Sequence, residues 1–243
     1  MTDLNALFAS KIFTDRTDAG QQLALALQRF KAARPVVLAL PRGGVPVAYE
    51  VAKALDAPLD LVLVRKIGTP WQPELAIAAV VDGSRPETVV NRDIVNKLNI
   101  PPSYIEERAT AELEEVERRR QLYLADRPRI DIAGRTTIVI DDGIATGATM
   151  EAALHATRRA GPERLILAVP VAPPETIERL RAEVDEIVCL ECPKLFGAIG
   201  LFYREFHQLS DDEVVNLLQR VKSEKQAPDE ASNPEGWNAD DPR

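Results

Sequence analysis

Apolar strands that alternate with helical segments restrict the fold of this 243-residue chain more than any other feature of its sequence. Mainly apolar runs at 35–40, 59–64, 136–140, 164–171 and 185–191 are typical of strands that are covered on both faces. Segments with apolar residues at helical spacing lie between most of these runs. The alternation predicts an α/β fold with a doubly wound, mostly parallel sheet.

The helical segments of this alternation can be placed from their spacing and their end signals. Helices are expected at 18–33, 45–55, 149–160 and 174–183. Asp18 is expected to cap the first of them, because its carboxylate can accept from an unpaired backbone N–H at the helix start.

The connection between the second and third expected strands is long and should contain structure of its own. Runs 75–81 and 87–91 flank a turn sequence and predict a hairpin. Residues 102–124 predict one long charged helix, which could serve as a lid, a dimer surface or a rigid insertion. Its favourable i,i+4 ion pairs are expected to be Glu114–Arg118 and Glu115–Arg119.

The C-terminal part of the chain divides into a small hood and a tail. We expect one domain over 1–221, with the hood formed by about 193–221, an aromatic cluster followed by a short capped helix. Residues 222–243 contain three basic and six acidic residues and little that could be buried. An acidic, disordered tail is therefore expected there.

The overall charge and the lack of long apolar runs exclude several classes of partner. The net charge is −8, and the body stays acidic without the tail, which argues against a nucleic-acid partner. No run approaches the ~20 apolar residues that a membrane helix needs. The first residues do not show the pattern of a secretory signal, which is a basic segment followed by an apolar run. We therefore expect a cytoplasmic protein that does not contact the membrane.

The two cysteines form a single Cys-x-x-Cys pair, Cys189 and Cys192. Such a pair can be redox-active or can supply half of a zinc site. The chain has no second pair, its two histidines lie elsewhere, and Cys189 belongs to an apolar run. Ordinary reduced thiols are the better interpretation, and no protein-held metal is expected.

Two strand–loop–helix units have loops of unusual composition, at 41–44 ("PRGG") and 141–149 ("DDGIATGAT"). The carboxyl ends of parallel strands meet at one edge of a sheet, where ligands of open α/β sheets bind. We therefore expect the two loops to face the same crevice.

The second loop has the composition of an anion site. Its glycines allow tight turning, its alanines keep bulk away, and a helix is expected to begin near Thr149, so several backbone N–H groups can converge on one phosphate. The threonine hydroxyls add donors. The spacing fits neither a Walker loop nor a dinucleotide fingerprint. The residues concerned are Gly143, Ala145, Thr146, Gly147, Ala148 and Thr149.

Asp141 and Asp142 precede this anion site directly, although adjacent carboxylates repel an anion. A sugar phosphate resolves the conflict, because its phosphate can lie on the amides and its hydroxyls on the carboxylates. The carboxylates can also stabilise positive charge at C1 of the ring. Two alternatives remain: a turn composition without a function, and an aspartyl-phosphate site, which would need a metal, a lysine and a hydroxyl nearby.

The segment "VIDDGIATGATM" resembles the phosphoribosyl diphosphate (PRPP) motif of type I phosphoribosyltransferases, and the layout agrees from about 35 to 191. The resemblance implies that Asp141 and Asp142 hold the ribose hydroxyls, and that 145–149 holds the 5-phosphate. "PRGG" resembles the family's pyrophosphate loop, whose backbone often contains a strained or cis peptide. The residues implied there are Arg42, Gly43 and Gly44. Arg65 and Lys66 resemble the basic pair that opens a mobile catalytic loop, and Lys66 joins the two aspartates as a catalytic candidate.

Further segments resemble a branch of that family whose acceptors are undefined, and this likeness covers nearly the whole chain except the tail. They include "AVPVAP" and "FYREF". Ala145 stands where the 6-oxopurine enzymes have an acidic residue, so a hypoxanthine–guanine activity is not expected. Acceptor contacts are expected from Val171, Ala172 and Tyr203, because an aromatic ring can stack on a flat base. Phe196 and Phe202 are expected to form the hood's own core.

The resemblance implies an enzyme that transfers the phosphoribosyl group from PRPP to a nitrogen of a base-like acceptor and releases pyrophosphate. Mg²⁺, held mainly through PRPP, and a homodimer are implied with it. The alternative is a non-catalytic protein that senses PRPP or a nucleotide with the same fold.

Overall fold

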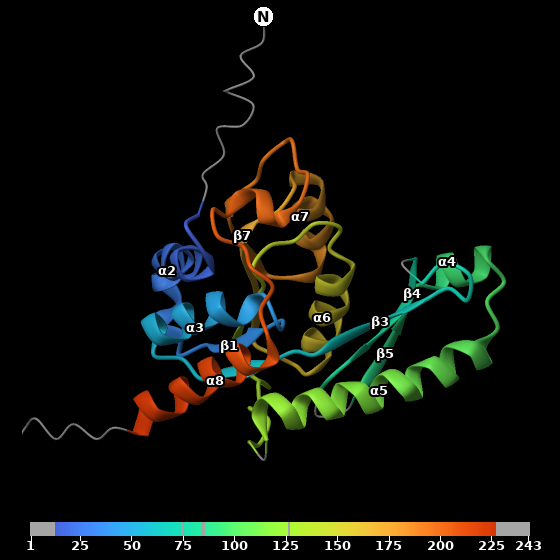
Figure 1. The fold of residues 1–243 in the computed structure, drawn as a ribbon, viewed down its shortest axis with the longest axis horizontal. Helices are drawn as coiled ribbons and strands as arrows, with labels where there is room; N and C mark the ends of the chain where they lie inside the picture. Colours follow the sequence, from blue (N-terminus) through green and yellow to red (C-terminus); the bar gives the residue numbers. More distant parts are fainter. Residues whose placement is uncertain (1–12, 74, 84–85, 126, 227–243) are drawn as a thin grey trace, which may run out of the picture.

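The computed structural model describes residues 13–73, 75–83, 86–125 and 127–226, with the backbone alone for 221–226 (Figure 1). Part of the expected tail, 227–243, lies outside the described residues. No helix in these ranges is both long and apolar enough to span a membrane.

A five-stranded parallel sheet forms the centre of the molecule, with the order β2-β1-β6-β7-β8. The chain therefore builds the doubly wound parallel sheet that the alternation of strands and helices predicts. Its order places β1 and β6, the strands that precede the two unusual loops, side by side. The strands are β1 (Val36–Ala39), β2 (Leu59–Leu61), β6 (Thr136–Ile140), β7 (Arg164–Val171) and β8 (Glu186–Glu191).

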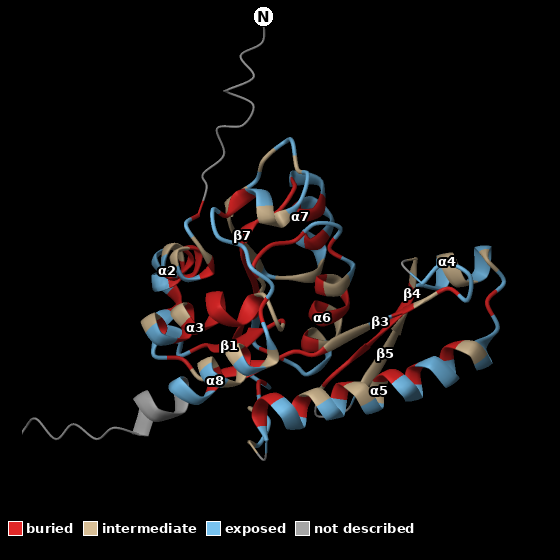
Figure 2. Ribbon diagram, in the orientation of Figure 1, coloured by how far each residue is buried: buried red, intermediate tan, exposed pale blue. Residues whose placement is uncertain are grey.

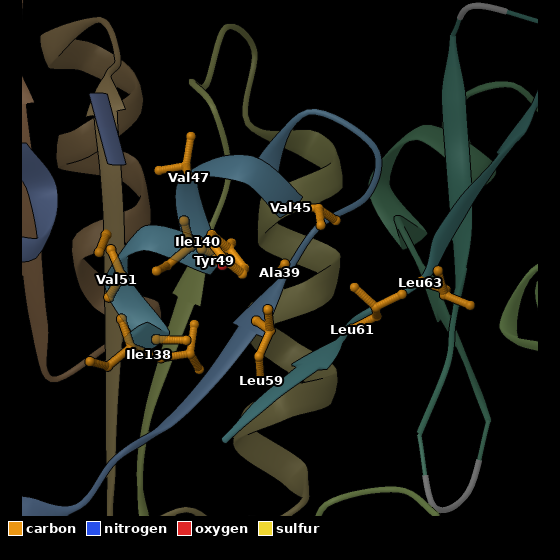
Figure 3. Packing of buried hydrophobic residues seen from close by; sticks show 14 of the residues in the cluster. Ala39, Val45, Val47, Tyr49, Val51, Leu59, Leu61, Leu63, Ile138 and Ile140 are labelled. Atoms are coloured by element: carbon orange, nitrogen blue, oxygen red, sulfur yellow. The ribbon is translucent and has the colours of Figure 1, made fainter. Parts of the chain in front are cut away.

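Helices cover both faces of this sheet (Figure 2). Successive strand residues enter opposite layers of core. In β1, Val37 and Ala39 pack toward one layer, and Val36 and Leu38 pack toward the other. Figure 3 shows the first layer, where strand residues such as Ile138 meet side chains of α3. Helices of the first layer are α2 (Arg16–Leu27), η1 (Gln28–Ala33), α3 (Gly44–Leu55) and α8 (Asp211–Gln226); the second layer has α6 (Ala148–Arg159), α7 (Pro174–Leu180) and η2 (Arg181–Glu183).

Residues 64–124 form an arm that extends from the side of the central sheet (Figure 1). A three-stranded antiparallel sheet, β3-β4-β5, is packed between α5 and α6 at the base of the arm. The expected hairpin and the expected long helix are both present. The arm contains β3 (Val64–Gly68), β4 (Ala76–Val81), β5 (Glu87–Val90), α4 (Arg92–Lys97) and α5 (Pro102–Leu124).

The run 59–64 is not one strand, contrary to the expectation from sequence. It leaves the parallel sheet after Leu61 and enters the arm's sheet at Val64. Val62 still donates to the Ala39 carbonyl, whereas the Leu63 carbonyl accepts from Asp82 in the arm. The two intervening residues thus carry the chain from one sheet to the other without a turn signal.

Two helix ends also differ from the sequence prediction. Asp15, rather than Asp18, caps α2: its side chain accepts from the Asp18 amide at 2.8 Å, while the Asp18 carboxylate accepts from the Thr14 amide at 2.8 Å. Helix α8 begins after Ser210, whose hydroxyl accepts from the Glu213 amide at 3.2 Å. It continues to Gln226, so 222–226 are helical although a disordered tail was expected from 222.

The expected hood divides into two parts that pack on different elements. Residues 193–206, for which we keep the word hood, include η3 (Ile199–Phe202), whereas α8 packs on α3 and α5. Phe196 stacks on Phe202 with ring centroids 5.3 Å apart, which confirms the expected aromatic core. The N-terminal segment joins this core, since Phe13 pairs with Tyr203 in an isolated bridge.

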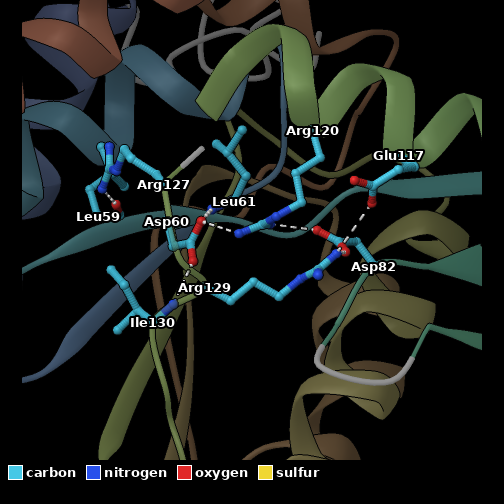
Figure 4. Close-up of polar contacts among 9 residues, drawn as sticks. All are labelled: Leu59, Asp60, Leu61, Asp82, Glu117, Arg120, Arg127, Arg129 and Ile130. Carbon is cyan, nitrogen blue, oxygen red and sulfur yellow. Dashed lines mark hydrogen bonds and ion pairs between the residues drawn. The ribbon is translucent and has the colours of Figure 1, made fainter. Parts of the chain in front are cut away.

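A buried ion-pair cluster fastens the arm to the body (Figure 4). Arg120 of α5 lies 2.7 Å from Asp82, which follows β4, and 3.4 Å from Asp60 of β2. Arg129 pairs with Asp82 from the opposite side. Arg120 therefore pairs with acids of both sheets rather than with a residue of its own helix.

The exposed face of α5 follows the i,i+4 expectation in part. Glu115 pairs with Arg119 and also with Arg118, each at 2.7 Å. These two bonds lower the pKa of Glu115 to about 2. Glu114, the expected partner of Arg118, makes no ion pair within the described part of the chain.

We predict that Asp82→Asn lowers the free energy of unfolding by about 3–5 kcal/mol, because it leaves two arginines, one of them buried, without their shared charge. Urea denaturation measures the difference. The matched control is Glu115→Gln, which removes an exposed pair and should cost about 1 kcal/mol or less. Equal losses in the two variants would contradict the assignment of Asp82 as the anchor of the arm.

Candidate functional site

The loops after β1 and β6 touch each other, as their parallel strands require. The Leu40 amide donates to the Ile140 carbonyl at 2.9 Å. A Cβ on Gly43 would overlap the Asp142 carboxylate, and one on Gly44 would lie 2.7 Å from the Ile140 carbonyl oxygen. Only glycine permits this approach. The peptide between Pro41 and Arg42 is cis.

Asp142 is almost fully buried and is held from three directions. Its Oδ2 lies 2.8 Å from Nε of Arg16, and both side chains are 9% exposed. The Tyr203 hydroxyl donates to the backbone carbonyl of Asp142 at 2.5 Å. The amide of Asp142 donates to Oδ1 of Asp141 at 2.8 Å. These contacts fix the position of Asp142 and the direction of its carboxylate.

Asp141 is half-buried, and no ion pair joins its carboxylate to a cation within the described ranges. Burial raises the pKa of its carboxyl well above the usual value, and the negative charge of Asp142 raises that pKa further. Burial, together with the charge of Asp142, also raises the pKa of Tyr203, whose hydroxyl therefore stays a donor. The two aspartates thus differ: Asp142 is paired and fixed, whereas burial and the neighbouring charge disfavour the ionised form of Asp141.

The segment 145–149 forms an open turn at the start of α6. Gly147 has a φ of 76°, which favours glycine, and serves as the N-cap of a 12-residue helix. Ala145, Thr146 and Ala148 are exposed, and Thr149 is half-buried. Helix α6 begins at Ala148, one residue before the expected start. Free N–H groups of a first helical turn are therefore available at an exposed surface.

Helix α7 supports this turn from one side. The Thr176 hydroxyl donates to the Ala145 carbonyl at 2.8 Å, and the Arg179 guanidinium donates to the Thr146 carbonyl. Because these contacts use carbonyl oxygens, they leave the N–H groups of the turn free. Arg179 also lies 3.7 Å from Glu151.

Arg42 lies at the rim of the site, half-buried. Its guanidinium is 3.7 Å from the Asp211 carboxylate at the start of α8. This is a long and partly exposed ion pair, which an anionic ligand could replace at small cost.

Arg65 and Lys66 do not lie in a loop, as the sequence suggested, but in β3 of the arm. The reason is that the run 59–64 divides between two sheets, which moves the basic pair into a strand. Arg65 pairs with Glu112 of α5 at 2.9 Å. Lys66 is exposed and lines a cavity of about 470 Å³ together with Ala148 and Glu151 of α6. The structure thus brings Lys66, but not Arg65, toward the start of α6.

The residues expected to contact an acceptor have little surface. Val171 and Ala172 are fully buried, and Tyr203 is 5% exposed. A Cβ on Gly143 would lie 2.7 Å from Cγ2 of Ile199 and 3.0 Å from Cγ1 of Val171. Ile199 of the hood therefore packs directly on the loop after the aspartates.

Sequence reasoning missed four residues at this site: Arg16, Thr176, Arg179 and Ile199. Only Arg16 had a usable signal. A cation in the first turn of a helix is disfavoured by the helix dipole, so its presence there indicates a specific partner. The other three lie on ordinary helix or hood positions.

We predict that Asp141→Asn stabilises the protein against heat at neutral and alkaline pH. The folded-state pKa is raised, so wild-type protein loses stability as pH rises above about 4, the value in an unfolded chain, and through the folded value. Asparagine does not titrate, and its Oδ1 can still accept from the Asp142 amide. Differential scanning calorimetry at pH 4–9 should show a Tm difference that grows with pH.

The matched control for this prediction is Asp212→Asn, which removes the same charge from an exposed position on α8. Its Tm difference from wild type should stay small at every pH. A constant difference for Asp141→Asn across the range would contradict the prediction.

Comparison with known proteins identifies relatives over most of the chain. "Putative phosphoribosyl transferase MT0597" and "Putative phosphoribosyl transferase Rv0571c", from two strains of Mycobacterium tuberculosis, are each 46% identical over 228 residues. These matches cover 92% of this chain and 51% of each relative, so the chain spans about half their length. The crystal structure of TT1426 from Thermus thermophilus has a TM-score of 0.76 and 43% identity, covering 86% of this chain and 98% of TT1426.

The family model described as "Phosphoribosyl transferase domain" matches residues 17–206. This interval contains the whole parallel sheet, both glycine-containing loops, the arm and the hood. The chain belongs to the phosphoribosyl transferase domain family.

Proposed function

We propose that this protein transfers the phosphoribosyl group of PRPP to a nitrogen of a base-like acceptor. The observation that carries the proposal is the contact of Gly43 and Gly44 with Asp141 and Asp142, beside the open turn at Gly147. The site then offers N–H donors for a phosphate and carboxylates that can accept from ribose hydroxyls. Its first loop contains two glycines, which a diphosphate can approach closely. In the reaction the C1–O bond to pyrophosphate breaks, a C1–N bond forms, and the acceptor nitrogen loses a proton.

The 5-phosphate of PRPP would bind at 145–149. The free N–H groups at the start of α6 and the hydroxyls of Thr146 and Thr149 would donate to its oxygens. Helix α7 supports this assignment, because it holds the carbonyls of the turn and leaves the N–H groups to the ligand.

The ribose would lie over the two aspartates. Their carboxylates would accept from its hydroxyls and stabilise the positive charge that grows at C1 as pyrophosphate leaves. Positive charge at C1 would favour the ionised form of Asp141, whose pKa is raised in the ligand-free protein by burial and by the charge of Asp142. No covalent nucleophile is needed when the chemistry consists of positioning and charge stabilisation.

Pyrophosphate would bind at 41–44, where Arg42 can exchange its distant partner Asp211 for a phosphate oxygen. Lys66 would supply a second cation from the arm, across the cavity beside Ala148. Arg65 is engaged by Glu112, so its part in pyrophosphate binding would require that ion pair to open.

Mg²⁺ would neutralise the charge of the diphosphate. Among the described residues, no group of three or more His, Cys, Asp or Glu side chains could bind a metal ion. An ion held mainly by oxygens of PRPP and water would need few ligands from the protein, and Asp141 and Asp142 could supply them.

The acceptor would bind between the loop after β6 and the hood. Gly143, Val171 and Ile199 form an apolar contact there, and small displacements of the hood would expose it to a flat ring. Tyr203 would act through its bond to the Asp142 carbonyl rather than by stacking. Ala145 leaves the loop without the acidic side chain that the 6-oxopurine enzymes have at this position.

Calorimetric titration with PRPP and Mg²⁺, followed by a panel of nucleobases with pyrophosphate monitored, tests the proposal. Binding with base-dependent release of pyrophosphate would establish the transferase and its acceptor. Binding without turnover on any base would favour the PRPP-sensing alternative. A wild-type protein that does not bind PRPP would overturn the assignment of the site.

We predict that Asp142→Asn lowers turnover by at least about 100-fold, because the site loses a preorganised charge beside C1. Initial rates of pyrophosphate release measure the effect, and Tm is recorded because Arg16 loses its charged partner. Asp212→Asn, which makes the same change on the exposed side of α8, should keep the wild-type rate. A folded Asp142→Asn protein with an unchanged rate would contradict the role of Asp142.

A further inference from the structure

Arg16 is a buried cation that the proposed reaction does not yet use. It lies in the first turn of α2, and only 8% of its surface is exposed. Nε donates to Oδ2 of Asp142 at 2.8 Å, and Nη1 donates to the His207 carbonyl at 2.9 Å. The guanidinium carbon lies 3.9 Å from the centre of the Phe206 ring. Three separate contacts therefore fix the position of the guanidinium.

The placement of Arg16 is unfavourable unless its contacts compensate for it. A cation at a helix N-terminus is repelled by the helix dipole, and burial removes its hydration. Arginine suits such a site better than lysine, because its planar donors can bond to two acceptors and stack on a ring at once. An arginine held in this way indicates a role at its main partner, Asp142.

The contacts around Asp142 leave one of its polar atoms available. Its amide, its carbonyl and Oδ2 are bonded to Asp141, Tyr203 and Arg16 respectively. Among the described residues, no donor is bonded to Oδ1. Rotation of the carboxylate would break the bond to Arg16, so Oδ1 is held in one direction.

We propose that Arg16 is a positioning residue that fixes the Asp142 carboxylate and presents its free oxygen to the ribose of the substrate. This inference rests on the proposed function and adds to it a residue 126 positions away in the sequence. Arg16 also places one positive charge beside two adjacent carboxylates, so the site can hold both of them before a ligand arrives.

A purely structural role of Arg16 predicts different behaviour. Its bond to His207 and its contact with Phe206 join α2 to the end of the hood. If these contacts were its whole purpose, loss of Arg16 would loosen the hood and lower the affinity of the site for every ligand. A positioning role predicts instead that only ligands with a ribose are affected.

The test compares ligands with and without a ribose. Calorimetry with Mg²⁺ and PRPP, with ribose 5-phosphate, and with inorganic pyrophosphate is carried out on wild type and Arg16→Gln. The variant should bind PRPP and ribose 5-phosphate about 10- to 100-fold more weakly, the effect of losing one charge-assisted hydrogen bond. Pyrophosphate affinity should change by less than about twofold, which is within the range of a remote surface change.

Two further variants separate the explanations. In the Asp142→Asn background, Arg16→Gln should cause no additional loss of PRPP affinity, because coupled residues are not additive. Arg29→Gln is the matched control, since Arg29 follows the same helix and pairs with Glu186 at the surface. It should bind all three ligands like wild type.

If Arg16→Gln does not fold, the same measurements are made on Arg16→Lys. Lysine keeps the charge but cannot bond to Asp142 and His207 with a fixed fork, so PRPP affinity should fall severalfold while pyrophosphate affinity is kept. Unchanged PRPP affinity in the folded variants, losses that add to those of Asp142→Asn, or equal losses for pyrophosphate would overturn the inference. Failure of wild type to bind PRPP would instead overturn the proposed function.

Discussion

The contact between the backbones after β1 and β6 is the constraint on which the rest of the site depends. Parallel pairing brings the ends of these strands to one edge, and the glycines at 43 and 44 allow the chain to pass directly against Asp141 and Asp142. A side chain at either glycine would push the two loops apart. The close contact of the two loops therefore depends on the order of the strands, and it fixes where α3 starts relative to the carboxylate pair.

Buried charge is used twice in this fold, with different results. Around Asp82 the acids and the arginines neutralise one another, and the cluster joins the arm to the body. Around Asp142 the neutralisation is incomplete, because among the described residues Arg16 is the one cation near two adjacent carboxylates and forms its ion pair with Asp142. Fully paired charge stabilises a fold, whereas unpaired charge is available to a ligand.

The sheet, the long helix and both loops could be predicted from sequence because their signals are local: apolar runs, helical spacing and glycines beside strand ends. The division of the run 59–64 between two sheets could not, since Val62 and Leu63 differ in no local property from their neighbours. Arg16 and Asp142 are 126 residues apart, and the hood that joins them comes from a third region. A contact of that kind depends on packing, which no local pattern records.

The passage of the chain from one sheet to the other at Val62 and Leu63 has a structural consequence. The arm meets the body at that strand crossing, at the arginines around Asp82 and where its sheet packs on α6, and Lys66 lies in β3 directly after the crossing. The position of Lys66 relative to the start of α6 is therefore set by the same contacts that join the two sheets.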